Sequence, residues 1–202
     1  AVVRVERDGV GDSDGPHCTD LDFEAELAGY RAGLDWVVEQ SWAAPLPVLF
    51  GHSLGGMIAP LLAPAGTRGI AVFGAGVGRL RDILLGTARR RAELVGMTGA
   101  ALGVFVASIE TVVDRVVVEG VSPAELYAER PELPAVASQW YAGDRVFGRV
   151  AAFYRQLEQR DLVSAWREVR VPVLALHGSA DWVASAPDTA RIAALAGEAA
   201  RS

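Results

Sequence analysis

Apolar positions along the chain form one clear helical repeat and several short runs. From residue 20 to residue 40 they recur at spacings of four, three, four and three, which predicts an amphipathic helix that Thr19 or Asp20 can cap. These positions are Phe23, Leu27, Tyr30, Leu34 and Val37. Short Val-rich or continuously apolar runs, bounded by glycine and proline, predict strands. The predicted strands are 1–6, 46–51, 69–77 and 171–178, and apolar stretches at 57–66 and 186–200 predict two further helices.

The predicted strands and helices alternate, and this order indicates an α/β class. Strands that are apolar throughout, separated by helices, are typical of a parallel sheet with helices on both faces, so the expected architecture is three-layered and doubly wound. The connection over 78–170 is far longer than the ~10–12 residues that a crossover needs. It contains a capping-box pattern at Ser122, Pro123 and Glu125, which indicates helices. We therefore expect core regions at 1–77 and 171–202 and an inserted helical cap at 78–170.

Composition limits the classes of protein. With 202 residues, 51% of them apolar, the chain is long enough for one sizeable core. A net charge of −6 with 22% charged residues favours neither disorder nor a nucleic-acid surface. The single cysteine, Cys18, excludes an internal disulfide framework.

Two uncharged stretches of the chain are candidates for membrane spans. Residues 40–67 are interrupted by prolines, and residues 94–109 are shorter than the ~20 apolar residues that a spanning helix needs. We therefore predict no membrane span. The simplest interpretation of 94–109 is a buried helix of the cap, and a lipophilic acyl pocket is the alternative.

The segment "GHSLGG" carries the strongest chemical signal. Ser53 stands in a G-x-S-x-G pattern directly after an apolar run and before an apolar helix. A serine on such a strained turn needs small neighbours two residues before and after it, and the N–H of Leu54 would then point toward a developing oxyanion. The alternative is a glycine-rich turn with an incidental serine. A P-loop is excluded because no G-K-[ST] follows.

Three segments together resemble the α/β-hydrolase family. "DGVGDSDGP" (8–16) looks like its glycine-rich loop, "GHSLGG" like its nucleophile turn, and "VPVLALHGSADWV" like its late strand. The resemblance implies that Ser53 is a nucleophile, that Asp181 is the acid of a triad, and that 78–170 is a cap. The residues alone also favour Asp181, which follows a buried strand at its carboxyl end. A loop-capping aspartate is the alternative role, and Asp188, at a predicted helix start, is a weaker candidate for the acid.

None of the three histidines is well placed as the base. His52 lies inside the turn and should point away from Ser53, His177 lies on a predicted strand, and His17 lies in the first loop. The family's order places the histidine after the acid, so we expect the base beyond residue 202. Compared with the family's pattern, the chain also lacks the strands that would precede residue 1, the loop with the second oxyanion donor and the last strand. The chain is thus expected to be a fragment, inert alone, whose residues 1–6 have no neighbouring strand.

The expected function is a serine hydrolase that acts on the ester, thioester or amide carbonyl of a small-molecule acyl substrate. A perhydrolase, a lyase or a non-catalytic binding protein with the same fold remains an alternative. No cofactor or metal is expected. The loop 8–16 has Val10 where a calcium loop needs an oxygen ligand, and His17 with Cys18 has no partner pair at zinc spacing. The three arginines at 89–91 predict a solvated helix face, with anion recognition as the alternative.

Overall fold

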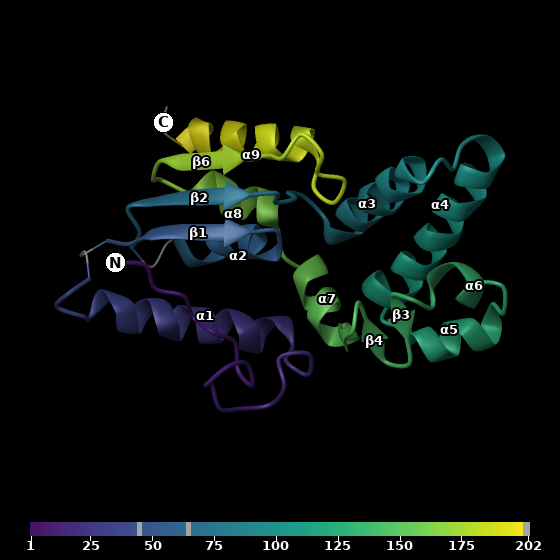
Figure 1. Ribbon diagram of the computed structural model, residues 1–202, viewed down its shortest axis with the longest axis horizontal. Helices are drawn as coiled ribbons and strands as arrows, with labels where there is room; N and C mark the ends of the chain where they lie inside the picture. The colour runs from purple at the N-terminus through teal and green to yellow at the C-terminus, as the bar shows by residue number, and fades with distance from the viewer. Residues whose placement is uncertain (44–45, 64–65, 200–202) are drawn as a thin grey trace. The chain divides into compact units, whose positions relative to one another are not determined.

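The computed structural model describes residues 1–43, 46–63 and 66–199 (Figure 1). Contacts divide the chain into two compact units. The sheet unit consists of Ala1–Val5, Leu27–Gly78 and Asp161–Ser202, and the helical unit consists of Glu6–Glu26 and Arg79–Arg160. These units follow contacts alone, and the predicted division into 1–77, 78–170 and 171–202 stays a prediction.

The sheet unit contains a three-stranded parallel sheet. Its strands are β1 (Val48–His52), β2 (Gly69–Phe73) and β6 (Val173–Leu176), in the order β1-β2-β6. The register pairs Gly51 with Val72 and Phe73 with Leu176, so the carboxyl ends of the three strands are level. Three of the four predicted strands are therefore confirmed, each somewhat shorter than expected.

The helices of the sheet unit follow the apolar repeats of the sequence. They are α1 (Phe23–Val38), whose residues up to Glu26 belong to the helical unit, α2 (Leu54–Leu62), α8 (Leu162–Glu168) and α9 (Ala186–Ala199). Helix α1 matches the predicted amphipathic helix, and the Arg31 guanidinium donates to the carbonyl of Leu61 in α2 (3.0 Å). The helices predicted at 57–66 and 186–200 extend over residues 64–65 and 200, which lie outside the described residues.

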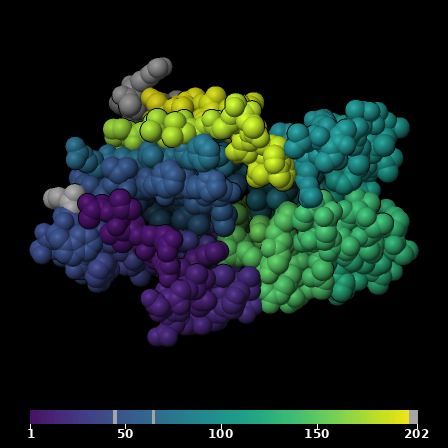
Figure 2. Space-filling view, in the orientation of Figure 1, coloured from purple at the N-terminus to yellow at the C-terminus, as the bar shows by residue number. Residues whose placement is uncertain are grey.

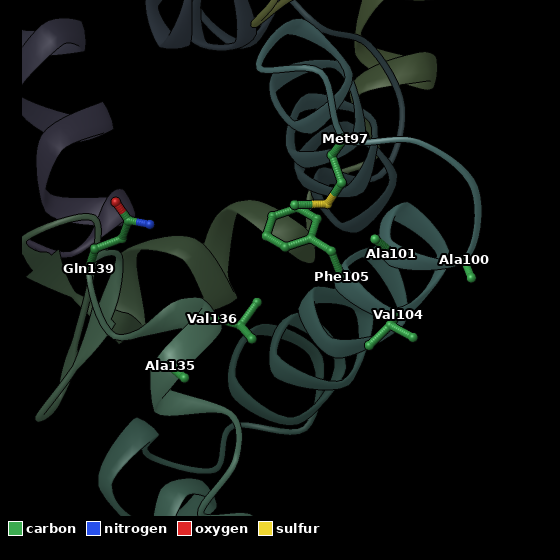
Figure 3. A pocket seen from close by; sticks show the side chains of 8 residues that line it. All are labelled: Met97, Ala100, Ala101, Val104, Phe105, Ala135, Val136 and Gln139. Atoms are coloured by element: carbon green, nitrogen blue, oxygen red, sulfur yellow. The ribbon is translucent and has the colours of Figure 1, made fainter.

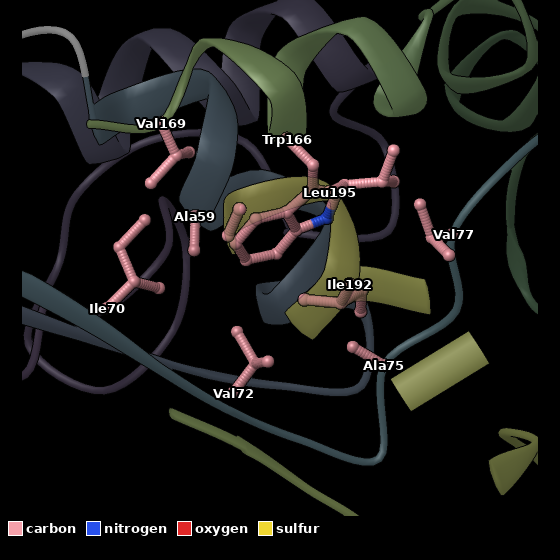
Figure 4. Close-up of a cluster of buried hydrophobic side chains, with 10 residues drawn as sticks. Ala59, Ile70, Val72, Ala75, Val77, Trp166, Val169, Ile192 and Leu195 are labelled. Atoms are coloured by element: carbon pink, nitrogen blue, oxygen red, sulfur yellow. The ribbon is translucent and has the colours of Figure 1, made fainter. Parts of the chain in front are cut away.

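One face of the sheet packs against helices and forms the core. Figure 4 shows Ile70 and Val72 of β2 facing Trp166 of α8 and Ile192 of α9. Trp166 is completely buried, and this explains why α8 belongs to the sheet unit. Burying an aromatic side chain of this size contributes several kcal/mol, of order 25 cal/mol per Å² of apolar surface.

The opposite face of the sheet is exposed. Because side chains alternate along a strand, Val48 and Phe50 of β1 and Leu174 of β6 point away from the core, and Phe50 is 70% exposed. Figure 2 shows atoms of these strands at the surface of the sheet unit. The sequence predicted helices on both faces. In the described part of the chain, α2, α8 and α9 all contribute to the core on a single face.

The strand predicted at residues 1–6 is wrong. These residues are not assigned to any strand, and Val2 is 98% exposed. A strand requires a neighbour to satisfy its backbone groups, and the parallel sheet of the described residues pairs β1, β2 and β6 without residues 1–6. Instead Val5 packs on α1, where a Cβ at Gly33 would lie 2.7 Å from a Val5 methyl group.

The helical unit contains most of the predicted cap. Its helices are α3 (Leu80–Leu94), α4 (Gly99–Val113), α5 (Pro123–Glu129), α6 (Pro134–Ala137) and α7 (Ala151–Glu158), and α4 continues into a π-helix, η2 (Asp114–Val118). The capping box is confirmed, because the Glu125 N–H donates to Ser122 Oγ (3.2 Å) and the Ser122 N–H donates to Glu125 Oε2 (3.0 Å). Hydrogen bonds from Ser122 lower the pKa of Glu125.

A small antiparallel sheet in the helical unit was not predicted. It consists of β3 (Tyr141–Ala142), β4 (Arg145–Val146) and β5 (Arg149–Val150). Strands of two residues are too short to show an alternating pattern. No helix within the described ranges combines the length and the apolar character needed to cross a membrane.

A buried ion pair joins residues 6–26 to this small sheet. The Arg149 guanidinium donates to the Glu26 carboxylate and to the Cys18 carbonyl (3.1 Å), and it lies 3.7 Å from the centre of the Phe153 ring. Glu26 is 4% exposed and Arg149 is 7% exposed. The N–H of Val150 also donates to the Thr19 carbonyl (3.0 Å). These bonds explain why the first loop belongs to the helical unit.

We predict that Arg149→Met destabilises the protein by about 3–5 kcal/mol, because the buried Glu26 carboxylate would lose its close partner and keep only the more distant Arg7 guanidinium (3.9 Å). Urea unfolding followed by circular dichroism measures this. Arg130→Met is the matched control, since the Arg130–Glu132 pair (2.6 Å) is exposed and such pairs contribute less than about 1 kcal/mol. Equal unfolding midpoints for the two variants would contradict the prediction.

Candidate active site

Ser53 occupies a strained turn between β1 and α2. Its φ of 53° and ψ of −117° form a combination that residues other than glycine rarely adopt and that costs about 1–3 kcal/mol. The turn is held by two hydrogen bonds, from the Ser53 N–H to the Phe73 carbonyl (3.0 Å) and from the Gly56 N–H to the Ser53 carbonyl (2.9 Å). Strain held in this way is concentrated at functional sites.

Two of the three glycines around Ser53 are required by close packing. A Cβ on Gly51 would overlap the carbonyl oxygen of Gly55, and a Cβ on Gly56 would overlap the Ala75 methyl group. A Cβ on Gly55 would meet no heavy atom within 4 Å. The sequence predicted that a small residue is needed two residues after Ser53, at Gly55, but the structure requires it three residues after, at Gly56. The backbone of Gly55 lies close to Gly51, whereas a methyl group at Gly55 would meet no other heavy atom within 4 Å.

Leu54 is the first residue of α2. The N–H groups in the first turn of a helix have no carbonyl partner within it, and the helix dipole favours negative charge at this end. The Leu54 N–H therefore has the properties that an oxyanion donor needs, and this role stays a prediction.

Asp181 lies in the loop after β6. Its Oδ1 accepts the N–H groups of Val183 (2.8 Å) and Ala184 (3.0 Å), which is the loop-capping role considered above. Its Oδ2 is directed toward the end of β2, since a Cβ on Gly74 would lie 2.8 Å from it. One oxygen thus fixes the loop and the other stays close to the sheet edge.

The structure brings Ser53 and Asp181 to the same edge of the sheet. Ser53 bonds to the last residue of β2, Phe73, and Asp181 approaches the next residue, Gly74. Gly74 was missed by the sequence analysis. Its φ of 58° and the nearby carboxylate both disfavour a side chain, and a glycine directly after a buried strand is the signal that identifies it.

The three histidines have other surroundings. The His52 ring is exposed and stacks on Phe73, with ring centres 5.6 Å apart. His177 Nδ1 is buried without a hydrogen-bond partner. His17 belongs to the helical unit, where its Nδ1 bonds to Thr19 Oγ1 (2.8 Å). Among the described residues, no hydrogen bond joins a histidine to Ser53 or Asp181.

The remaining candidates have structural explanations. Asp188 belongs to the cap of α9, because Ser185 Oγ accepts the Asp188 N–H (3.1 Å) and donates to the Asp188 carboxylate (2.7 Å). Arg89 pairs with Glu93 (3.7 Å), and Arg91 lies over the Trp140 ring. Within the described ranges, no group of three or more His, Cys, Asp or Glu side chains could hold a metal ion.

Comparison with known proteins gives one family match. The model of the alpha/beta hydrolase family matches residues 1–201. No curated protein matches the chain in sequence.

Several solved structures are similar at low identity. A monoacylglycerol lipase from Paleococcus ferrophilus is 18% identical, with 90% of this chain and 63% of the lipase covered and a TM-score of 0.45. MenH from S. aureus is 19% identical, with coverages of 94% and 69% and a TM-score of 0.47. An alpha/beta hydrolase from Sphaerobacter thermophilus is 20% identical, with coverages of 97% and 68% and a TM-score of 0.41. The chain thus spans less than two thirds of the lipase.

The packing around Ser53 predicts different effects for neighbouring glycines. Gly51→Ala and Gly56→Ala should each lower the melting temperature by several degrees, because the new methyl group overlaps backbone or core atoms. Gly55→Ala, with open space at its Cβ, is the control and should change the melting temperature little. Differential scanning calorimetry measures all three. If Gly55→Ala proved as destabilising as the other two, this account of the turn would be wrong.

Proposed function

Because the chain belongs to the alpha/beta hydrolase family, we propose that it carries the nucleophile and the acid of a serine hydrolase. The observation that supports this most is the arrangement at the end of β2. Ser53 is held in a strained turn on one side of it, and Asp181 directs a carboxylate oxygen to it from the other. A half-buried serine at the N-terminus of a helix, with an acid after a neighbouring strand end, is suited to acyl transfer.

In the proposed reaction, Ser53 Oγ attacks the carbonyl carbon of the substrate. A histidine outside residues 1–202 accepts the hydroxyl proton, and Asp181 holds that histidine in the required tautomer and stabilises its charged form. The carbonyl oxygen becomes an oxyanion that accepts a hydrogen bond from the Leu54 N–H. The histidine then protonates the leaving group, and an acyl-serine remains. Water, deprotonated by the same histidine, attacks the acyl carbon; the bond from this carbon to Ser53 Oγ then breaks, the histidine returns the proton to Ser53 Oγ, and the acid is released.

The proposed substrate is a small carboxylic ester, with a thioester or an amide as alternatives. A lyase or perhydrolase reaction on the same scaffold is a further alternative, since a fold does not determine a reaction. One observation favours a second candidate function, a non-catalytic binding protein. His17, His52 and His177 form no bond to Ser53 or Asp181 in the described residues, so these contain no assembled triad.

Labelling with a fluorophosphonate probe distinguishes the two functions. We expect the full-length protein to form a covalent adduct on Ser53, detected by mass spectrometry of the tryptic peptide. Ser53→Ala should form none. Ser108→Ala is the matched control, because Ser108 lies on α4 and donates only to the Val104 carbonyl (2.9 Å). A folded full-length protein without an adduct would support the binding protein.

Replacing the acid tests its role apart from loop capping. Asp181→Asn keeps an oxygen for the N–H groups of Val183 and Ala184, but it cannot stabilise a charged histidine. In the full-length protein we expect kcat for p-nitrophenyl butyrate to fall by about 10⁴-fold with little change in melting temperature. Asp188→Asn, which alters only the cap of α9, should retain most of the activity. Equal activity of Asp181→Asn and the unmodified protein would leave Asp181 with the capping role alone.

A further inference from the structure

A surface groove lies between α4 and α6 of the helical unit (Figure 3). Its volume is about 640 Å³, within the range of about 300–1,000 Å³ found for small-molecule sites. Seven of its eight lining residues are apolar and the eighth is Gln139. Within the described part of the chain, no charged side chain lines it.

One wall of the groove is apolar, and the other wall includes an amide side chain. Ala101 and Phe105 of α4 form one wall, and Val136 and Gln139 lie on the other side (Figure 3). Met97 closes one end, with its sulfur drawn beside the Phe105 ring. A thioether on an unbranched side chain adapts its shape to a ligand at small cost.

The surface around the groove is also apolar. Residues 94–109 carry no charge, and Leu94, Val95 and Val104 are 68%, 73% and 69% exposed. The prediction of a buried helix over this segment is therefore wrong, because most of its residues face solvent. An exposed apolar region of this kind marks an interaction site.

The lining selects the chemistry of the occupant. A charged group would lose its hydration in the groove without gaining a partner. A peptide strand would need several backbone partners, and Gln139 is the single polar side chain that the described lining offers. An uncharged, unbranched hydrocarbon chain needs neither, and one amide at the groove suits a neutral polar group at its end.

We propose that this groove binds the linear alkyl chain of a neutral amphiphile, one chain per protein. Affinity then rises with chain length, by about fourfold for each added methylene that becomes buried.

The test uses the fluorescent apolar probe N-phenyl-1-naphthylamine and its displacement by 1-butanol, 1-hexanol, 1-octanol and 1-decanol. The unmodified protein should bind one probe molecule, and displacement should strengthen steadily with alcohol length. Ala101→Phe fills the groove and should weaken probe binding by at least tenfold. Ala107→Phe is the matched control, because Ala107 is another exposed alanine of α4 and is not among the residues that line the groove.

Equal binding by Ala101→Phe and Ala107→Phe, or displacement independent of chain length, would overturn the proposal. So would a dimer in size-exclusion chromatography that Ala101→Phe alone abolishes, since a second copy would then be the occupant. Ser53→Ala should bind the probe like the unmodified protein. If fluorophosphonate does not label Ser53 but the probe is still displaced in a length-dependent way, the proposed hydrolase function is wrong and the proposed binding groove stands. If Ser53 is labelled but probe binding does not depend on the groove, the hydrolase function stands and the proposed groove is wrong.

Discussion

The parallel register of β1, β2 and β6 determines where every proposed chemical group lies. Because the three strands end at the same level, the segments that follow them meet along one edge of the sheet. The central strand serves both neighbours, since Phe73 accepts the hydrogen bond of Ser53 and Gly74 leaves space for Asp181. A slip of β2 by one residue would turn its buried side chains to the exposed face and separate these partners. The register of the sheet thus positions the candidate site, and the loops that follow the strands depend on it.

The turn at Ser53 adds a second constraint to this edge. Ser53 is held in a backbone conformation that normally requires glycine. The hydrogen bonds of its N–H and of its carbonyl offset the free-energy cost of this conformation. The glycines are distributed accordingly. Gly51 allows one backbone to approach another, and Gly56 allows α2 to pack on Ala75 of the sheet edge. The position of the nucleophile therefore depends on contacts made by residues that take no part in chemistry.

Much of this could be predicted from local patterns, and the errors have physical causes. Periodicity identified α1, and a capping box identified the start of α5. The G-x-S-x-G pattern located the turn, because its steric demands are local. Residues 1–6 failed as a strand because pairing depends on a neighbour that local sequence cannot supply. The Glu26–Arg149 bond joins distant segments, and neither residue belongs to a motif. Gly74 was missed for the same reason, since its constraint comes from Asp181.

The exposed face of β1 and β6 has a thermodynamic consequence. Side chains such as Phe50 and Leu174 are hydrated in the folded chain, so unfolding changes their contact with water little. The heat capacity of unfolding arises mainly from newly hydrated apolar surface, at about 12–15 cal/mol/K per residue in ordinary globular proteins. For residues 1–202 the increment per residue should fall below this range. The stability curve against temperature should accordingly be flatter than that of a protein of equal length whose sheet is covered on both faces.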